Sequence, residues 1–300
     1  MTEVKLPSGV GWTAFLTAYS RAQESREATA GFDDPFASMF IGAVTGAQTV
    51  DAGEFPRVGP AVDDGSSPFW RAMRFYFCAR TPFYDQQVLR AVDAGCRQVV
   101  LLGAGLDSRA FRLGLGEDVT VFELDQAPVL DFKHAVLDGH GATPTGTRVP
   151  VRADLRDDWP RALSAAGFDA SRPAVWVAEG LLMYLTRRDA DRLLAAVTAR
   201  SAPGSRLAGE YFGGEWQESD AITADEQESA AWELMRQAFR YGPVADTPAD
   251  WLTGHGWTPG QTTTIVELGT GQDREYVPPE FARPGAPRVL LFDGTRPAER

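Results

Sequence analysis

The chain has 300 residues, 44% of them hydrophobic and 23% charged, which is the composition of a globular protein with a sizeable core. The formal net charge of −12 disfavours nucleic acid and anionic membranes as partners, because an acidic surface repels phosphate groups. The sequence shows no metal-binding or disulfide spacing of its two cysteines, no signal-peptide pattern and no apolar run of membrane-spanning length. We therefore expect a cytoplasmic protein without a metal site.

Residues 1–95 are predicted to be mainly helical. A capping side chain followed by proline is typical of a helix start, and three such pairs occur, at Asp34-Pro35, Ser67-Pro68 and Thr81-Pro82. The aromatic residues of the stretch 69–77 recur at helical spacing, which predicts a helix that packs against a sheet. The stretch 42–67 is rich in glycine, aspartate and proline, and we expect a loop there.

The next stretch, QVVLLGAGLDSRAFR, reads as a strand, a glycine turn and a helix. Gln98–Leu102 is a short apolar run with β-branched residues, as in a strand buried on both faces. Gly103 and Gly105 break the run and let the backbone approach a ligand closely. This arrangement presents nucleotide-like ligands at the carboxyl edge of an open α/β sheet. Ser108 stands where the dinucleotide fingerprint requires a third glycine, so the turn alone does not identify the ligand.

Three further strand-like runs end in an acidic residue, at Thr120–Asp125, 148–154 and 174–179. If they pair in one parallel sheet, the glycine turn, Asp125, Asp154 and Glu179 lie along a single edge. Asp125 follows Gly105 by 20 residues, where such folds carry the carboxylate that accepts from both ribose hydroxyls. Glu123, on the same run as Asp125, is expected to face the core.

A fifth strand is predicted at 205–212, and the last two, at 262–268 and 288–292, are expected to form an antiparallel hairpin. Between the fifth and the sixth strand, the insertion 213–259 carries helix starts at Thr223-x-x-Glu226 and Thr247-Pro248. We expect it to stand over the carboxyl edge as part of a substrate pocket. Four of its aromatic residues are candidates for either a lid or simple packing: Trp216, Trp232, Phe239 and Tyr241.

Four blocks, LGAGLDSRAFRL, VFELDQAPVLDFK, ADLRDDW and AEGLLMYL, resemble the signature blocks of the leucine carboxyl methyltransferase family in its bacterial branch. RAQES and DDPFA extend the resemblance towards residue 21, whereas the stretch after Glu210 matches loosely. The resemblance implies a class I S-adenosylmethionine-dependent methyltransferase: a Rossmann-like α/β fold with a seven-stranded sheet, a helical N-terminal extension and a helical lid insertion. We expect one domain over 1–300, divided into a helical part (1–95), a cofactor-binding core (96–212), the lid (213–259) and C-terminal strands (260–300).

The resemblance also implies site residues. It places the cofactor S-adenosylmethionine against Gly103, Ala104 and Gly105, its ribose on Asp125, and its adenine on Asp154 and Leu155. Glu179 is expected near the methionine end, and Arg80 of the segment CARTPF holds the methionine carboxylate. A second segment, with Arg21, Glu24 and Arg26, is hypothesised to fold over the cofactor. Candidates for the acceptor side are Arg109, Tyr184 and Phe239, with Tyr184 the one catalytic candidate.

The predicted reaction is methylation of a carboxylate on a small molecule or peptide. A carboxylate is ionised at pH 7 and needs no general base, whereas a hydroxyl usually does. The three histidines, at 134, 140 and 255, belong to no motif at the ligand edge. Methylation of a hydroxyl remains the first alternative. Outside methyl transfer, the alternatives are a nicotinamide-dependent oxidoreductase, which Ser108 and the Asp154-Leu155 block disfavour, and a non-catalytic cofactor-binding protein.

Overall fold

The computed structural model describes residues 9–27, 30–48, 56–214, 222–242, 247–272, 277–284, 286 and 288–298. Within these residues the central sheet has seven strands in the order β3-β2-β1-β4-β5-β7-β6. The strands are β1 (Gln98–Leu102), β2 (Thr120–Asp125), β3 (Thr147–Arg152), β4 (Ala174–Ala178), β5 (Arg206–Gly213), β6 (Thr258–Thr264) and β7 (Arg288–Thr295). Pairs among β1 to β5 are parallel, whereas β7 runs antiparallel to β5 and β6. The predicted α/β sheet with an antiparallel final hairpin is confirmed.

Helices connect the strands and precede the sheet. The long ones are α1 (Thr13–Glu24), α2 (Pro35–Gln48), α3 (Pro68–Asp93), α5 (Ala127–Gly139), α7 (Arg187–Thr198) and α8 (Glu226–Ala238). The short ones are α4 (Arg109–Arg112), α6 (Trp159–Ala165), α9 (Pro248–Gly254), α10 (Ile265–Gly271) and α11 (Pro279–Ala282). Two 3-10 turns, η1 (Gly9–Trp12) and η2 (Leu182–Tyr184), complete the order. None of the helices in the described ranges is both long and apolar enough to cross a bilayer.

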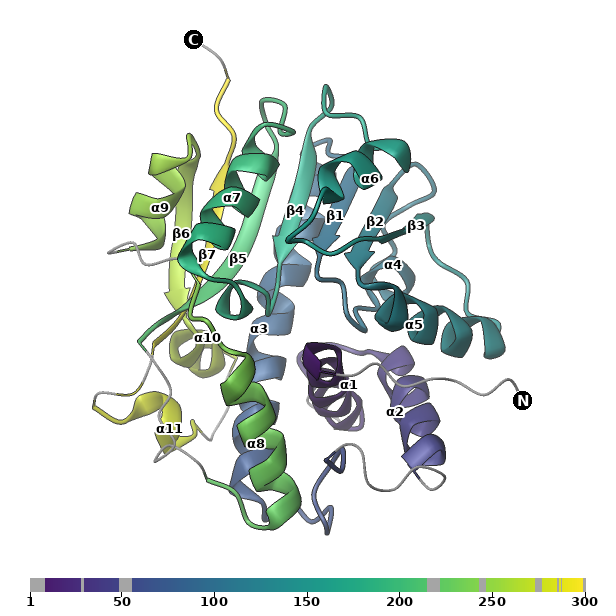
Figure 1. Cartoon of the computed structure of the whole chain (residues 1–300), viewed down its shortest axis with the longest axis vertical. Coiled ribbons are helices and arrows are strands. Elements are labelled where there is room, and N and C mark those ends of the chain that lie inside the picture. Colours follow the sequence, from purple (N-terminus) through teal and green to yellow (C-terminus); the bar gives the residue numbers. More distant parts are fainter. Residues whose placement is uncertain are drawn as a thin grey trace.

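The sheet is the middle of three layers (Figure 1). Alternate residues of β1 face opposite sides: Val99 and Leu101 belong to the core that includes α3 and α5, while Val100 and Leu102 belong to the core that includes α6 and α7. A parallel strand covered on both faces has to be apolar throughout, which explains the unbroken run of β1. In Figure 1, α1 and α8 lie below the sheet, on the side where β4 ends. The carboxyl edge is therefore covered from below.

The predicted strand 262–268 is wrong in its second half. The strand ends at Thr264, and α10 begins at Ile265. The cause is a capping box: the Thr264 side chain accepts from the N–H of Glu267, and the Glu267 side chain accepts from the N–H of Thr264. Two unpaired donors are satisfied in this way, which favours a helix start over a longer strand.

Three predicted boundaries in the helical parts also need correction. Thr81-Pro82 does not start a helix, because Pro82 lies inside α3. Its neighbours Phe83 and Tyr84 are buried, so packing offsets the roughly 3 kcal/mol that an internal proline costs. The predicted loop 42–67 begins too early, since α2 extends to Gln48. Helix α8 is capped by Asp225, whose side chain accepts from the N–H of Glu228, and not by Thr223.

Candidate functional site

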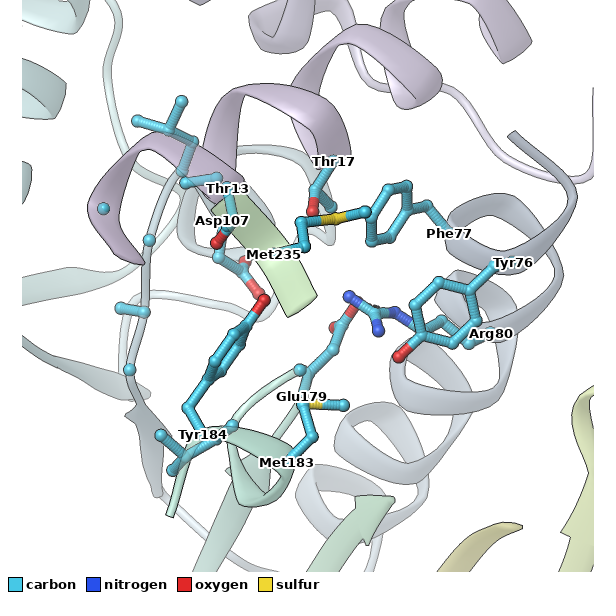
Figure 2. Close-up of a pocket in the computed structure, with 18 of the residues that line it drawn as sticks. Thr13, Thr17, Tyr76, Phe77, Arg80, Asp107, Glu179, Met183, Tyr184 and Met235 are labelled. Atoms are coloured by element: carbon cyan, nitrogen blue, oxygen red, sulfur yellow. Dashed lines mark hydrogen bonds and ion pairs between the residues drawn. The ribbon is translucent and has the colours of Figure 1, made fainter. Parts of the chain in front are cut away.

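A cavity of about 310 Å³ lies at the carboxyl edge of the sheet. Its floor is the glycine turn after β1 together with the ends of β2, β3 and β4. Its cover comes from α1 and α8, which are far apart in the sequence, and further wall residues come from α3 and α11. Figure 2 shows Tyr184, Glu179, Arg80 and Met235 pointing towards one central space from different elements.

The glycine turn is shaped for a close approach. Gly103 and Gly105 have φ of 66° and 47°, a backbone region that favours glycine. A Cβ on Gly103 would lie 3.2 Å from Cδ1 of Leu181, and one on Gly105 would lie 3.4 Å from Cβ of Ala14. Any larger residue would fill the space between the turn and its cover. The predicted close-approach turn, with Ala104 between the two glycines, lines the cavity.

Asp125 ends β2 beside this turn, because β1 and β2 pair in a register that matches Leu102 with Leu124. Its Oδ2 accepts from the N–H of Gly105 and its Oδ1 from the N–H of Gln126, both at 2.7 Å. Burial raises the pKa of Asp125 above its usual value, although these two backbone hydrogen bonds act in the opposite direction. The carboxylate therefore faces the cavity with fixed orientation, and each oxygen keeps a further lone pair for a ligand.

Asp154 and Leu155 follow β3 and also line the cavity. Asp154 is held by Arg156, which donates through its backbone N–H, through Nε at 2.9 Å and through Nη2 at 2.5 Å. These side-chain hydrogen bonds lower the pKa of Asp154 to about 2. The acid expected at the adenine is thus ionised and partly occupied by a neighbouring cation.

Arg80 and Glu179 form an ion pair at the end of β4. The buried Arg80 donates from Nε to Oε1 of Glu179 at 3.1 Å and from Nη1 to Oε1 of Glu210 at 2.5 Å. Its guanidinium also stacks over the ring of Tyr76, 4.4 Å from the centroid. Both acids are brought together by the pairing of β4 with β5, which matches Ala178 with Gly209. Figure 2 shows Arg80 reaching across to Glu179 beside Tyr76.

Glu210 is a central residue that the sequence reading missed. Its Oε1 accepts from Arg80, from the hydroxyl of Tyr76 at 3.0 Å and from the N–H of Gly180 at 2.9 Å. The side chain is fully buried, and burial raises its pKa despite the charge of Arg80. The signal was present: an acid in the middle of a buried, mostly apolar strand requires a partner.

Arg109 does not occupy the position expected for it. It does not line the cavity, and it is not an exposed helix residue either, since 2% of its surface is accessible. Its Nε donates to Asp85 at 2.7 Å and its Nη1 to Glu179 at 2.7 Å, and it also pairs with Asp107. Three protein carboxylates thus surround this guanidinium, and the prediction that it binds an acceptor carboxylate is not supported.

The hypothesised cover segment is present, but only one of its three charged residues reaches the cavity. Arg21 lines it and donates from Nη2 to the carbonyl of Leu106 at 2.6 Å and from Nε to Asp34 at 2.8 Å. Glu24 pairs instead with Arg74, and Arg26 lies on the exposed surface. Thr13, Ala14 and Thr17 of α1 also line the cavity, and the short Ala14 side chain allows α1 to lie close to Gly105.

Of the acceptor-side candidates in the insertion and nearby, Tyr184 and Phe239 lie in the cavity wall with their ring centroids 5.4 Å apart. The hydroxyl of Tyr184 is hydrogen-bonded with Thr13 of α1. Trp232 also lines the cavity, whereas Tyr241 is not one of its lining residues and packs against Phe239. Trp216 lies outside the described residues.

The second helix of the insertion, α9, is not part of the cover. Trp251 of α9 packs on Phe292 of β7 with ring centroids 6.0 Å apart, and α9 contacts β6 and β7. It therefore shields one face of the sheet. Glu123 faces the core as expected, paired with Lys133 at 2.9 Å and Arg148 at 2.7 Å.

The chain is similar in sequence to known proteins. A family model described as leucine carboxyl methyltransferase matches residues 14–198. A Mycobacterium ulcerans protein is 37% identical over 306 residues, covering 98% of this chain and 96% of its own length. A Mycobacterium bovis BCG protein is 41% identical over 273 residues, covering 88% of each chain. Both are named provisionally as S-adenosyl-L-methionine-dependent methyltransferases.

Two solved structures share the fold. A DUF574 family protein from Streptomyces avermitilis has a TM-score of 0.56 at 15% identity, covering 95% of this chain and 97% of its own. A protein from Thermobifida fusca, titled provisionally as a methyltransferase, has a TM-score of 0.52 at 19% identity, covering 95% and 94%. At these identities the likeness concerns the fold alone.

Proposed function

Because this chain belongs to the leucine carboxyl methyltransferase family and is an S-adenosylmethionine-dependent methyltransferase, we propose that it methylates a carboxylate on a small-molecule or peptide acceptor. The family match and the methyltransferase relatives argue against the alternative of a nicotinamide-dependent oxidoreductase. The observation that carries the choice of a carboxylate is the absence of histidine from the described residues that line the cavity.

The residues present fit the cofactor. A Cβ at either glycine of the turn would fill the gap beneath α1 and η2, and the aligned strand ends provide acids at the positions where a nucleoside is bound. In the proposed assignment, Asp125 accepts from the ribose hydroxyls, and Asp154 and Leu155 hold the adenine. The turn formed by Gly103, Ala104 and Gly105 is proposed to contact the middle of the cofactor.

The methionine end is assigned to Arg80 and Glu179. Nε and Nη1 of Arg80 are used by Glu179 and Glu210, and no acceptor among the described residues bonds its Nη2. That nitrogen is the proposed donor to the methionine carboxylate, while the two acids fix the plane of the guanidinium. The bound cofactor supplies an electrophilic methyl group on a positively charged sulfur.

The chain's part in the reaction is to position the acceptor and exclude water. A carboxylate is already ionised at pH 7, so no side chain has to remove a proton. The cavity wall beyond the ion pairs is apolar and largely buried, and opposite charges attract more strongly there than in water. In the proposed reaction a carboxylate oxygen would bond to the methyl carbon as the bond from that carbon to sulfur breaks, which would leave a neutral ester and neutral S-adenosylhomocysteine. Because both charges are cancelled, an apolar pocket favours this displacement. Tyr184 and Phe239 are proposed to orient the acceptor.

The stability of the product in base tests the proposal. We expect methyl groups from tritiated S-adenosylmethionine to enter a product that releases methanol in mild base, because esters hydrolyse under conditions that leave ethers intact. A label that resists base would show that the acceptor is not a carboxylate.

Methylation of a hydroxyl is the second candidate, and one observation favours it. Glu280 of α11 lines the cavity, and among the described residues no hydrogen bond or ion pair engages its carboxylate. It is thus available as a general base, which a hydroxyl acceptor would require. A base-stable product together with a large loss of kcat in Glu280→Gln would support this alternative. A base-labile product with unchanged kcat in Glu280→Gln would support the carboxylate.

A further inference from the structure

On the side of the cavity next to β5 and α8, the wall is apolar and aromatic. It is built by side chains from four separate elements, namely Met73, Phe77, Phe212, Trp232, Met235 and Phe281. The first five are buried, so this part of the cavity is enclosed by the fold. Because the glycine turn and the nucleoside-binding strand ends lie on the other side, this wall is where the acceptor would lie.

The positive charges that line the cavity are already matched by carboxylates of the protein. Among the described residues three arginines line it, and each is paired: Arg21 with Asp34, Arg80 with two glutamates, and Arg156 with Asp154. Neither lysine nor histidine occurs among the described lining residues. The body of the acceptor therefore meets a surface that offers it packing contacts and few polar partners.

Methionine is concentrated at this site. The structure describes four of the five methionines, and three of them, Met73, Met183 and Met235, line the cavity. Thioether side chains are flexible and polarizable, and they make favourable contacts with aromatic rings. Figure 2 shows Met183 and Met235 on either side of the central space, with Phe77 and Tyr76 on the adjoining wall. A wall of rings and thioethers suits a flat aromatic ligand, through edge-to-face and sulfur contacts.

We propose that the acceptor is a small carboxylic acid whose body is apolar and aromatic, an inference that rests on the proposed carboxylate chemistry. A peptide terminus fits this wall poorly, since its backbone N–H and C=O groups would be buried without partners. A polar acid would lose hydration without compensation for the same reason. An aliphatic acid would be buried but would forgo the ring contacts.

Competing acceptors of matched charge test the proposal. The probes are 2-naphthoate, decanoate and the dipeptide N-acetyl-alanyl-leucine, offered to the full chain with tritiated S-adenosylmethionine. We expect kcat/KM for 2-naphthoate to exceed that for each of the others by at least about tenfold, as differential binding of the body predicts. Higher kcat/KM for decanoate or the dipeptide would overturn the aromatic assignment while leaving carboxylate chemistry intact.

The neutral probe 2-naphthol separates this inference from the proposed function. If 2-naphthol is methylated to a base-stable ether and 2-naphthoate is not, the carboxylate proposal fails while the aromatic pocket stands. Binding gives a readout that does not depend on turnover: calorimetry of 2-naphthoate with the chain saturated by sinefungin, a cofactor analogue with no transferable methyl group. Lack of saturable binding to that complex would overturn the aromatic pocket.

Met235→Ala and Met39→Ala form a matched pair. Met235 lines the cavity, whereas Met39 lies on α2 outside it. We expect Met235→Ala to raise the Kd of 2-naphthoate by about five- to twentyfold, with cofactor affinity within about twofold, because only packing against the ring is lost. Met39→Ala should change neither. If Met235→Ala weakens the cofactor and spares 2-naphthoate, this wall is not the acceptor subsite.

Discussion

Replacing Asp125 with alanine should weaken cofactor binding without unfolding the protein. The carboxylate accepts from two backbone N–H groups at 2.7 Å and has further lone pairs directed at the cavity. Hydrogen bonds to a charged group contribute about 1.5–3 kcal/mol, and each 1.4 kcal/mol is tenfold in affinity. The Kd of S-adenosylhomocysteine should therefore rise roughly 10- to 150-fold. Both backbone donors border the cavity, so water can replace their lost partner in the variant.

Calorimetry at pH 7 measures the effect, and circular dichroism checks the fold. Asp131→Ala is the matched control: it removes the same charge from α5, where the side chain is exposed and paired with Arg152 at 2.6 Å. Its Kd should stay within about twofold of the wild type, since exposed pairs contribute little. Asp125→Asn serves if the alanine variant does not fold. A folded Asp125 variant that binds as tightly as the control would show that β2 does not hold the ribose.

Three further predictions concern the same edge. Arg80→Lys should raise the Kd of S-adenosylhomocysteine at least about tenfold, because an ammonium group cannot reproduce the planar, forked donors of a guanidinium. Arg90→Lys, at an exposed position of α3, should leave this Kd unchanged in the same titration. Burial raises the pKa of Asp107, but the guanidinium two residues on outweighs it and sets the value at about 2. The stability that this acid contributes is present above its unfolded pKa of 3.8 and is lost as pH falls towards 2. Urea unfolding should therefore show the wild type losing about 1 kcal/mol more than Asp107→Asn between pH 6 and pH 3. Gly105→Ala should cost about 1–2 kcal/mol of stability and also weaken the cofactor, whereas Gly114→Ala, with a similar φ but open space around its Cβ, should show the stability cost alone.

The sheet could be predicted from the sequence because its signals are local. The run from Val99 to Leu102 is uniformly apolar, and a glycine turn and acid-ended strands follow it along the chain. Where two local signals competed, the prediction failed. Thr263 and Thr264 suit a strand, yet the Thr264–Glu267 capping box starts a helix there. Thr81-Pro82 predicted a helix start, but the burial of the aromatic residues Phe83 and Tyr84 keeps α3 continuous through Pro82.

The site was only partly predictable, because ion pairing is not a local property. Arg109 and Glu179 are 70 residues apart and meet at 2.7 Å only once β1 and β4 are paired. Sequence alone could not show that this arginine is surrounded by acids and turned away from the cavity. Glu210 lies 130 residues from Arg80, and its role depends on the register of β4 and β5. The sequence contained one indication of this role, namely that Glu210 is an acid within a mostly apolar predicted strand and therefore needs a partner.

Pairing of the protein's own charges has a consequence for the order of binding. Every arginine that lines the cavity in the described part of the chain is matched by an acid. An acceptor carboxylate would therefore find its opposite charge on the cofactor and not on these arginines. Burying that carboxylate in the apolar wall without a counter-charge is costly, so cofactor should bind first. The affinity of 2-naphthoate should then depend on the charge at the cofactor's reactive centre.

Two cofactor analogues separate charge from shape. Sinefungin carries an amine in place of the methylsulfonium group, and this amine is protonated and positively charged at pH 7. S-adenosylhomocysteine has a neutral thioether at the same position. We expect 2-naphthoate to bind the sinefungin complex at least about tenfold more tightly than the S-adenosylhomocysteine complex, because a partly desolvated pair of charges contributes about 1.5 kcal/mol or more. The neutral 2-naphthol should show no such preference. Equal affinity of 2-naphthoate for both complexes would mean that the protein itself supplies the counter-charge, through a cation that these pairings leave unassigned.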